Sequence, residues 1–365
     1  MSKGKKLKGQ ALGPAIVSVA NAARAFDAPV RYPVLFRAPH LGEGGLVGTM
    51  AFPRMSSFIA MIEHLFGFLI LFPILWITRG FTKLKEAVKS FDKRDWFAVF
   101  FISFGGSALG LFFFLISFAL GNPTIAILLQ KAQPLITLIF AFFILKERPR
   151  ILFWATLGLA IVGIGLIVTP DIQASVQTYD YTGLIAILCS LLAATLWGGS
   201  TVFGRILTKK VDFWDLTLLR YIGGFIFLVV FNVVLFTYNG EYFRMLAENV
   251  SIFKADWGWQ LPIGVCIFYF ALLTGGVLPL ALYYFGLKRT RAAVAGIAEL
   301  AFPLLAIFVN WYFLGWGLNR FQAIGAGILF AAVSVLSFVN AREMEKKKKL
   351  TKKEEEKEET VTNKE

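Results

Sequence analysis

Several charged side chains stand inside long apolar segments of this sequence. Arg24, Asp27 and Arg31 are spaced i, i+3 and i+7, so a helix would project all three from one face. An ionisable group at the centre of a membrane helix costs about 2.5–3.5 kcal/mol on insertion scales, so each one is a candidate functional residue. We interpret Asp27 and Arg31 either as substrate-binding groups on a cavity wall or as part of a self-neutralising ion cluster near a helix end.

Glu63 and His64 form a second group of this kind. Adjacent residues point about 100° apart on a helix, so these two side chains cannot face the same partner. Histidine titrates near neutrality, and a carboxylate in a low-dielectric site can exchange a proton during a transport cycle. Both are therefore candidates for proton coupling. The alternative is a Glu63–Arg31 bridge that holds the first two helices together.

A third group lies in the fourth and ninth apolar segments. We expect Glu299, together with Gln130 and Gln133, to line a central cavity. There Glu299 would act as a proton acceptor or as the counter-charge to a cationic substrate group. The alternative is a structural ion pair between Lys131 and Glu299.

Three aromatic residues complete the candidate site. Trp197, Tyr283 and Tyr284 fall near the middle of apolar segments, away from the membrane interface where Trp and Tyr usually gather. We predict that they contact substrate, with core packing as the alternative.

Membrane helices are the elements that must position these residues. Of the 365 residues, 57% are hydrophobic and 16% are charged, against about 25% charged in soluble domains. A membrane-spanning helix needs about 20 predominantly apolar residues, and nine segments meet that length, with residues 11–36 as a weaker tenth. The sequence therefore predicts an all-α integral membrane protein with ten transmembrane helices. The ten segments are 11–36, 56–78, 96–120, 122–145, 150–169, 181–208, 213–238, 260–287, 290–315 and 320–340.

Other classes of protein fit poorly. Cys189 and Cys266 lie in apolar runs, which excludes a disulfide framework and a CxxC metal site. The sequence contains no P-loop, no GxSxG and no HExxH motif. We therefore expect no enzymatic activity, no ATP-driven step, no metal and no cofactor.

The distribution of basic residues predicts the orientation. With a cytoplasmic N-terminus, 28 of the 37 Lys and Arg residues lie in cytoplasmic segments, five lie outside and four lie within spans. This asymmetry follows the positive-inside rule, so we place both termini in the cytoplasm. The formal net charge of +14 then reports orientation and does not indicate a nucleic-acid partner.

An internal repeat appears when the sequence is shifted by 169 residues. The shift places Pro134 on Pro303 and Gly106 on Gly275. Five helices in each half give the halves opposite topologies, and such inverted repeats are typical of secondary transporters with a site near the membrane midplane. The predicted organisation is a cytoplasmic N-terminus (1–10), two five-helix repeats (11–170 and 181–340) and a disordered charged tail (341–365).

Three motifs carry a resemblance to a known family. They are GNPTIAILLQKAQPLITLIFAFFILKERP, which contains Glu147, its counterpart RTRAAVAGIAELAFPLLAIFVNWYFLG, and Leu196-Trp197-Gly198 followed by Arg220. In these features residues 56–340 resemble the drug/metabolite transporter superfamily, specifically its paired EamA-type architecture. The chain departs from that pattern at Asp27-Ala28-Pro29, where a Trp-Gly pair is common.

The resemblance implies a carrier of small organic metabolites or drugs. With the repeat and the charged groups, it leads us to expect a secondary transporter of the plasma membrane, in the form of a proton-coupled exporter. The alternatives are an uncoupled exchanger or facilitator and a protein that translocates lipids or glycolipids. Expected partners are a small-molecule substrate and membrane lipids, without nucleic acid, and the protein is expected to be a monomer or a homodimer.

Overall fold

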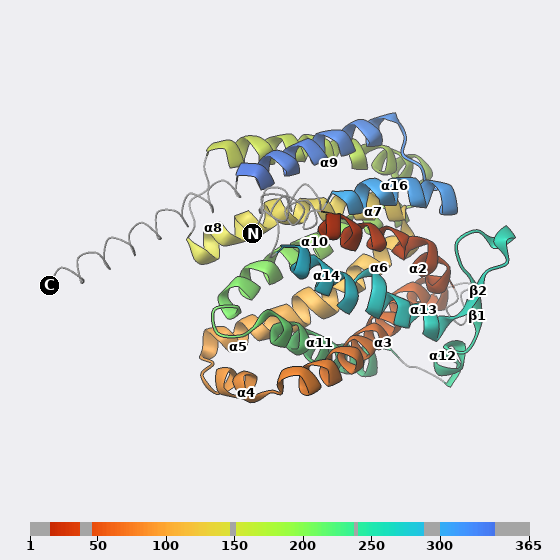
Figure 1. Cartoon of the computed structure of the whole chain (residues 1–365). Coiled ribbons are helices and arrows are strands. Elements are labelled where there is room, and N and C mark those ends of the chain that lie inside the picture. Colours follow the sequence, from red (N-terminus) through yellow and green to blue (C-terminus); the bar gives the residue numbers. More distant parts are fainter. Residues whose placement is uncertain (1–14, 37–45, 147–150, 237–239, 288–299, 340–365) are drawn as a thin grey trace, which may run out of the picture.

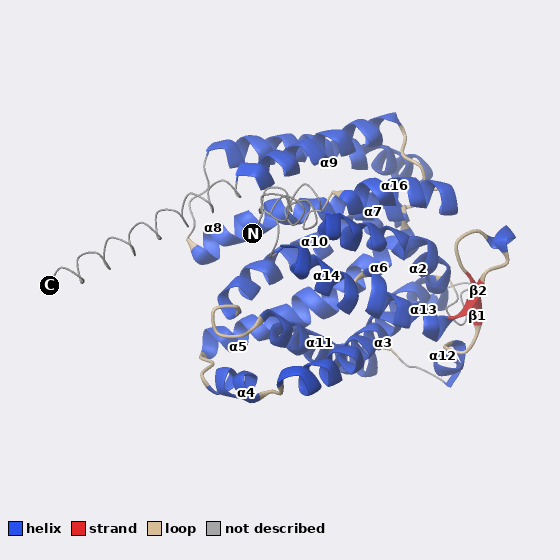
Figure 2. Cartoon of the chain, viewed as in Figure 1, coloured by secondary structure: helices blue, strands red, loops and turns tan. Residues whose placement is uncertain are grey.

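The computed structural model describes residues 15–36, 46–146, 151–236, 240–287 and 300–339, and these are almost wholly helical (Figure 2). Within these ranges, eight helices are long and apolar enough to cross a membrane, and Ala301–Leu314 is a shorter apolar helix. Residues 15–35 are helical as well, but they are not among the eight. The described residues thus fit the predicted helical membrane protein and do not confirm a count of ten spans.

The helices follow the predicted segments with some changes at their ends. The first half contains η1 (Arg24–Phe26), α2 (Asp27–Leu35), α3 (Leu46–Arg79), α4 (Thr82–Lys89), α5 (Lys93–Phe100), η2 (Phe101–Leu109), α6 (Gly110–Leu120), α7 (Pro123–Leu129), η3 (Gln130–Ala132), α8 (Gln133–Leu145) and α9 (Ile151–Thr178). The second half contains α10 (Thr182–Leu207), α11 (Phe213–Leu235), α12 (Gly240–Met245), β1 (Asn249–Ser251), η4 (Ala255–Trp257), β2 (Gln260–Pro262), α13 (Ile263–Tyr269), η5 (Phe270–Thr274), α14 (Val277–Leu287), α16 (Ala301–Leu314) and a final helix, Arg320–Val339.

Helix α10 lies at the centre of the bundle, where it packs against α6, α8 and η2, while α11 packs against α3 and η2 (Figure 1). Helix α9 and the final helix lie together along one side of the molecule. Their backbones approach closely, because a Cβ atom added at Gly163 would lie 2.8 Å from the carbonyl oxygen of Gly325. Small residues allow this kind of close helix crossing in membranes.

Among the residues that the structure describes, two spans contain a stretch of π-helix. These stretches are η2, between α5 and α6, and η5, between α13 and α14. Both begin at a phenylalanine, Phe101 and Phe270, and the two positions are related by the 169-residue shift. A π-helical turn is rare and is frequently found at functional sites. The two repeats therefore share this local departure from α-helical geometry at equivalent positions.

A short antiparallel hairpin covers one end of the bundle. Strands β1 and β2 pair with Asn249 opposite Pro262, so the predicted span 260–287 begins with a strand and becomes helical at Ile263. The hairpin is tied to α2 by the backbone N–H of Phe253, which donates to the carbonyl oxygen of Pro29 at 3.1 Å. That carbonyl has no helical partner because Pro33, four residues later, has no N–H.

Ion pairs connect helix ends at the opposite end of α3. Arg79 binds Asp212 at 2.8 Å and Asp215 at 2.7 Å, which joins the end of α3 to the start of α11. Lys210 binds Asp95 at the start of α5. Both contacts lie beside segments rich in basic residues, where the carboxylates offset part of the positive charge.

Candidate functional site: a charged cavity between the two repeats

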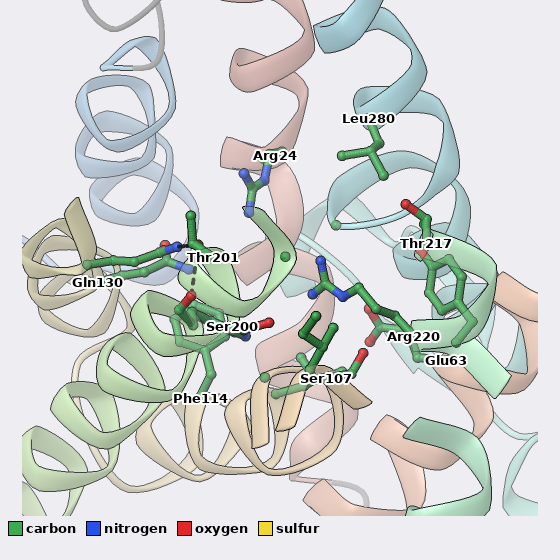
Figure 3. Close-up of a pocket in the computed structure, with 18 of the residues that line it drawn as sticks. Arg24, Glu63, Ser107, Phe114, Gln130, Ser200, Thr201, Thr217, Arg220 and Leu280 are labelled. Atoms are coloured by element: carbon green, nitrogen blue, oxygen red, sulfur yellow. Dashed lines mark hydrogen bonds between the residues drawn. The ribbon is translucent and has the colours of Figure 1, made fainter. Parts of the chain in front are cut away.

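A cavity of about 530 Å³ lies among the helices and is lined by residues of both repeats (Figure 3). Helix α10 and the residue that caps its C-terminus, Thr208, present one face to it along several turns. The lining residues are spaced three or four apart: Trp197, Ser200, Thr201, Gly204, Arg205 and Thr208. Helix α11 does the same through Phe213, Leu216, Thr217, Arg220 and Tyr221. This spacing is that of one helical face, so the wall follows directly from helical geometry.

An ion triad forms part of the cavity wall. Arg31 binds both oxygens of Asp27, at 2.6 and 2.8 Å, and its Nη1 binds Glu63 Oε2 at 2.7 Å. The Arg31 guanidinium also lies over the ring of Phe270, with its Cζ 3.9 Å from the ring centroid. Asp27 accepts a further hydrogen bond from the hydroxyl of Thr274 in η5. Because Arg31 is only 3% exposed, the triad is a buried, well-bonded cluster that joins α2, α3 and η5.

His64 takes different partners from those of its neighbour, as the angle between adjacent helical residues requires. Its Nδ1 lies 2.8 Å from the carbonyl oxygen of Ala60, and its Nε2 lies 2.9 Å from the hydroxyl of Ser107 in η2. A carbonyl only accepts, so Nδ1 carries the hydrogen, and in the neutral ring Nε2 accepts from Ser107. Gly224 of α11 permits this packing, since a Cβ there would lie 2.6 Å from the His64 ring.

The structure brings most of the candidate site residues to one place. Those that line the cavity are Asp27, Arg31, Glu63, His64, Gln130, Gln133 and Trp197. Glu299 lies outside the described residues, and so do the side chains of Tyr283 and Tyr284, although Leu280 of the same helix lines the cavity. The structure contains the Glu63–Arg31 bridge that was one of the two alternatives for Glu63, and Glu63 also lines the cavity. Its role in proton coupling stays a prediction.

Sequence reasoning missed the hydroxyl and arginine groups of α10 and α11. No role was predicted for Arg205, and Arg220 was named only through the family resemblance, yet both line the cavity. The available signal was periodicity, since Trp197, Thr201 and Arg205 recur every four residues.

The cavity is lined by both aromatic and polar side chains. Trp197 and Phe114 pack edge to face with ring centroids 5.2 Å apart. The ring of Phe302 is engaged by two cations, with Arg24 Cζ 5.0 Å and Lys131 Nζ 5.2 Å from its centroid. The polar lining residues present hydroxyl, amide and guanidinium groups, which bind oxygen-rich solutes by hydrogen bonds. A polar cavity enclosed by apolar helices from two repeats is typical of membrane transport proteins.

The chain belongs to the EamA-like transporter family, whose profile matches residues 42–169 and 184–338. This confirms the family resemblance inferred from the sequence motifs. It also establishes a multi-pass membrane transporter, built from two copies of the family's unit.

Three known proteins are similar in sequence to this chain, and two of them are named as transporters. "Riboflavin transporter ImpX" of Fusobacterium nucleatum is 32% identical over 81% of this chain and 94% of its own length. "Uncharacterized transporter YoaV" of Bacillus subtilis is 23% identical over 59% of this chain and 66% of its own length. "Protein PecM" of Dickeya dadantii is 24% identical over 67% of this chain and 75% of its own length. Among solved structures, one chain aligns over 90% of this protein and 99% of itself, with a TM-score of 0.49 and 16% identity.

Proposed function

We propose that this protein carries riboflavin, or a flat heterocycle of similar shape with a polyhydroxylated chain, across the plasma membrane. The observation that carries the proposal is the similarity to the riboflavin transporter of Fusobacterium nucleatum, at 32% identity over 94% of its length. A relation of that extent favours a shared substrate class.

The chemistry of the cavity supports a flavin. The ring system of riboflavin has a pyrimidine edge with two carbonyl oxygens, ring nitrogens and one N–H, and its side chain carries hydroxyl groups. Arg220 supplies donors for such an edge, and Gln130 supplies both a donor and an acceptor. Trp197 offers an aromatic surface, while Ser200 and Thr201 offer hydroxyls for the side chain. The volume of about 530 Å³ lies within the range of about 300–1,000 Å³ of sites for small organic ligands.

The proposed orientation places both termini in the cytoplasm. The cavity lining extends to Arg205 and Thr208 at the end of α10 and to Phe213 at the start of α11. The connection between these helices contains Lys209 and Lys210, so the positive-inside rule assigns this end of the cavity to the cytoplasm. The described conformation would then present its cavity to the cytoplasmic side.

Proton coupling is part of the proposal and is assigned to the ion triad. Glu63 bridges from α3 to Arg31, and a proton on Glu63 would weaken this bond while Asp27 keeps Arg31 in place. The link between the first two helices would then depend on protonation, which is the requirement for coupling substrate movement to a pH gradient. Export remains the proposed direction.

The test is transport by the full chain in proteoliposomes. Flavin fluorescence or radiolabel should show exchange of external for internal riboflavin, and an imposed pH gradient should drive net accumulation. Glu63→Gln should retain exchange while losing the response to the gradient, whereas the exposed control Arg320→Gln should behave as the wild type. Absence of riboflavin exchange by a folded protein would overturn the proposed substrate. Accumulation that ignores the gradient would overturn the coupling.

A further inference from the structure

The charges that line the cavity are unbalanced. Four arginines, Arg24, Arg31, Arg205 and Arg220, stand against two carboxylates among the described lining residues. Both carboxylates, Asp27 and Glu63, are bonded to Arg31. The ion triad therefore has a formal charge of −1, and the other three arginines add +3.

Further groups near the cavity do not reverse this sign. Lys131 lies 5.2 Å from the ring of Phe302, so it adds positive charge close to the wall. Glu299 lies outside the described residues, and counting it in full would still leave the lining positive. The argument rests on total charge, since Arg24, Arg205 and Arg220 each interact with other groups of the protein.

An excess of guanidinium groups in an enclosed site has a direct physical consequence. Low-dielectric walls focus the electrostatic potential, so a positively charged cavity concentrates anions. Guanidinium groups also match the geometry of carboxylates and phosphates, to which they can donate two parallel hydrogen bonds. A neutral solute would use these donors only as ordinary hydrogen bonds.

The arginines are placed to act on one bound group. In Figure 3 the guanidinium groups of Arg24 and Arg220 are directed into the same space. Thr217 lines this space one helical turn before Arg220, and Ser200 lines it from α10. Arg205 stands about one turn beyond Thr201, toward the end of the cavity assigned to the cytoplasm. An anion entering there would pass Arg205 before it reached the other two guanidinium groups.

We propose that the cavity selects solutes that carry an oxyanion, a phosphate or a carboxylate, with Arg220 and Arg24 as its binding groups and Arg205 at its entry. Only the choice of flavin probes below rests on the proposed function, because the preference for an anion follows from the cavity charge. For flavins, the inference means that the phosphate ester of riboflavin binds more tightly than riboflavin itself.

The experiment measures binding to the purified full chain with two matched pairs of probes. One pair is riboflavin and riboflavin 5′-phosphate, and the other is uridine and uridine 5′-monophosphate, with uridine-5-carboxylate added to distinguish a carboxylate from a phosphate. We expect the anionic member of a pair to bind about tenfold more tightly at low salt. This ratio should shrink as the ionic strength rises through the range where screening becomes effective.

The variants locate the effect. Arg220→Gln should reduce the anion preference to about twofold or less, because it should weaken binding of the anionic member more than binding of the neutral member. Arg220→Lys keeps the charge and should retain part of the preference, which also tests whether the site tolerates substitution. Arg320→Gln, an exposed position away from the cavity, should leave the preference unchanged.

The outcomes separate this inference from the proposed function. Equal binding of the neutral and anionic members in every pair, or no binding of any probe, would overturn the inference. A preference that survives Arg220→Gln and Arg24→Gln would overturn the assignment to these residues. If riboflavin is transported but no anionic probe binds more tightly than its neutral partner, the inference fails and the function stands. If anionic uridine probes are preferred and no flavin binds, the inference stands and the flavin proposal fails.

Discussion

Replacing Arg31 by Met is expected to destabilise the protein more than any removal of a single surface charge. The substitution deletes bonds of 2.6 and 2.8 Å to Asp27 and of 2.7 Å to Glu63, and it leaves two carboxylates that are less than one tenth exposed. Removing one partner from a buried ion pair costs about 3–5 kcal/mol, because the remaining charge stays buried without compensation. With an unfolding entropy of about 2.1 cal/mol/K per residue, this corresponds to a decrease in Tm of about 4–7 °C for a chain of this length.

The assay is thermal unfolding of the detergent-solubilised protein, followed by its tryptophan fluorescence. The triple variant Asp27→Asn, Arg31→Met, Glu63→Gln removes all three charges together and should recover most of the lost stability. Arg320→Met is the control for loss of an exposed arginine and should change Tm by less than about 1 °C, as surface substitutions usually do. A Tm for Arg31→Met within 1 °C of the wild type, or a triple variant no more stable than the single one, would refute the reasoning.

Three further outcomes follow from local geometry. Gly163→Ala places a methyl group against the final helix and should lower the free energy of unfolding by about 1–3 kcal/mol. Gly158→Ala, on the same helix, meets open space and should leave the free energy of unfolding unchanged. Equal Tm values for the two variants would contradict this expectation. The hydrogen bond to Asp95 raises the pKa of Lys210 above its usual 10.5. The contribution of this contact to the stability of the folded protein is therefore fully present below about pH 10.5, and it is lost as the pH rises through the raised pKa. The Tm difference between the wild type and Lys210→Gln should therefore disappear in strongly alkaline buffer, and a difference that persists there would exclude this contact. Trp197→Ala should weaken riboflavin binding by up to about tenfold, because aromatic contacts contribute about 0.5–1.5 kcal/mol each. Trp197→Phe should weaken it by less. Equal losses of affinity in an equilibrium binding assay would argue against a contact between the ring and riboflavin.

Hydropathy located the long helices well because one property, a run of about 20 apolar residues, determines them. It placed their ends less well. Helix α3 begins at Leu46, ten residues before the predicted start, and α9 continues to Thr178 instead of ending at residue 169. The hairpin before Ile263 was not predicted, because its strands of three residues are too short to produce a pattern.

The candidate site was predictable only in part. Spacing along one helix predicted that Asp27 and Arg31 share a face, and the structure has them bonded. The pairing of Glu63 with Arg31 depends on how close two helices lie to each other. The spacing of residues along either helix carries no information about that distance. Arg220 was harder to find, because an arginine in the second turn of a span also fits a side chain that extends to the membrane interface.

The hydrogen bond between Phe253 and Pro29 has a consequence for how this protein tolerates mutation. Its donor is a main-chain N–H, a group that every residue except proline has. Its acceptor is available only because position 33 is a proline. The hydrogen bond therefore needs no particular side-chain atom at position 253, but it does need the proline at position 33 in helix α2. Pro33→Ala would return the carbonyl of Pro29 to its own helix, and a defect in the hairpin could then arise from a mutation far from it in the sequence.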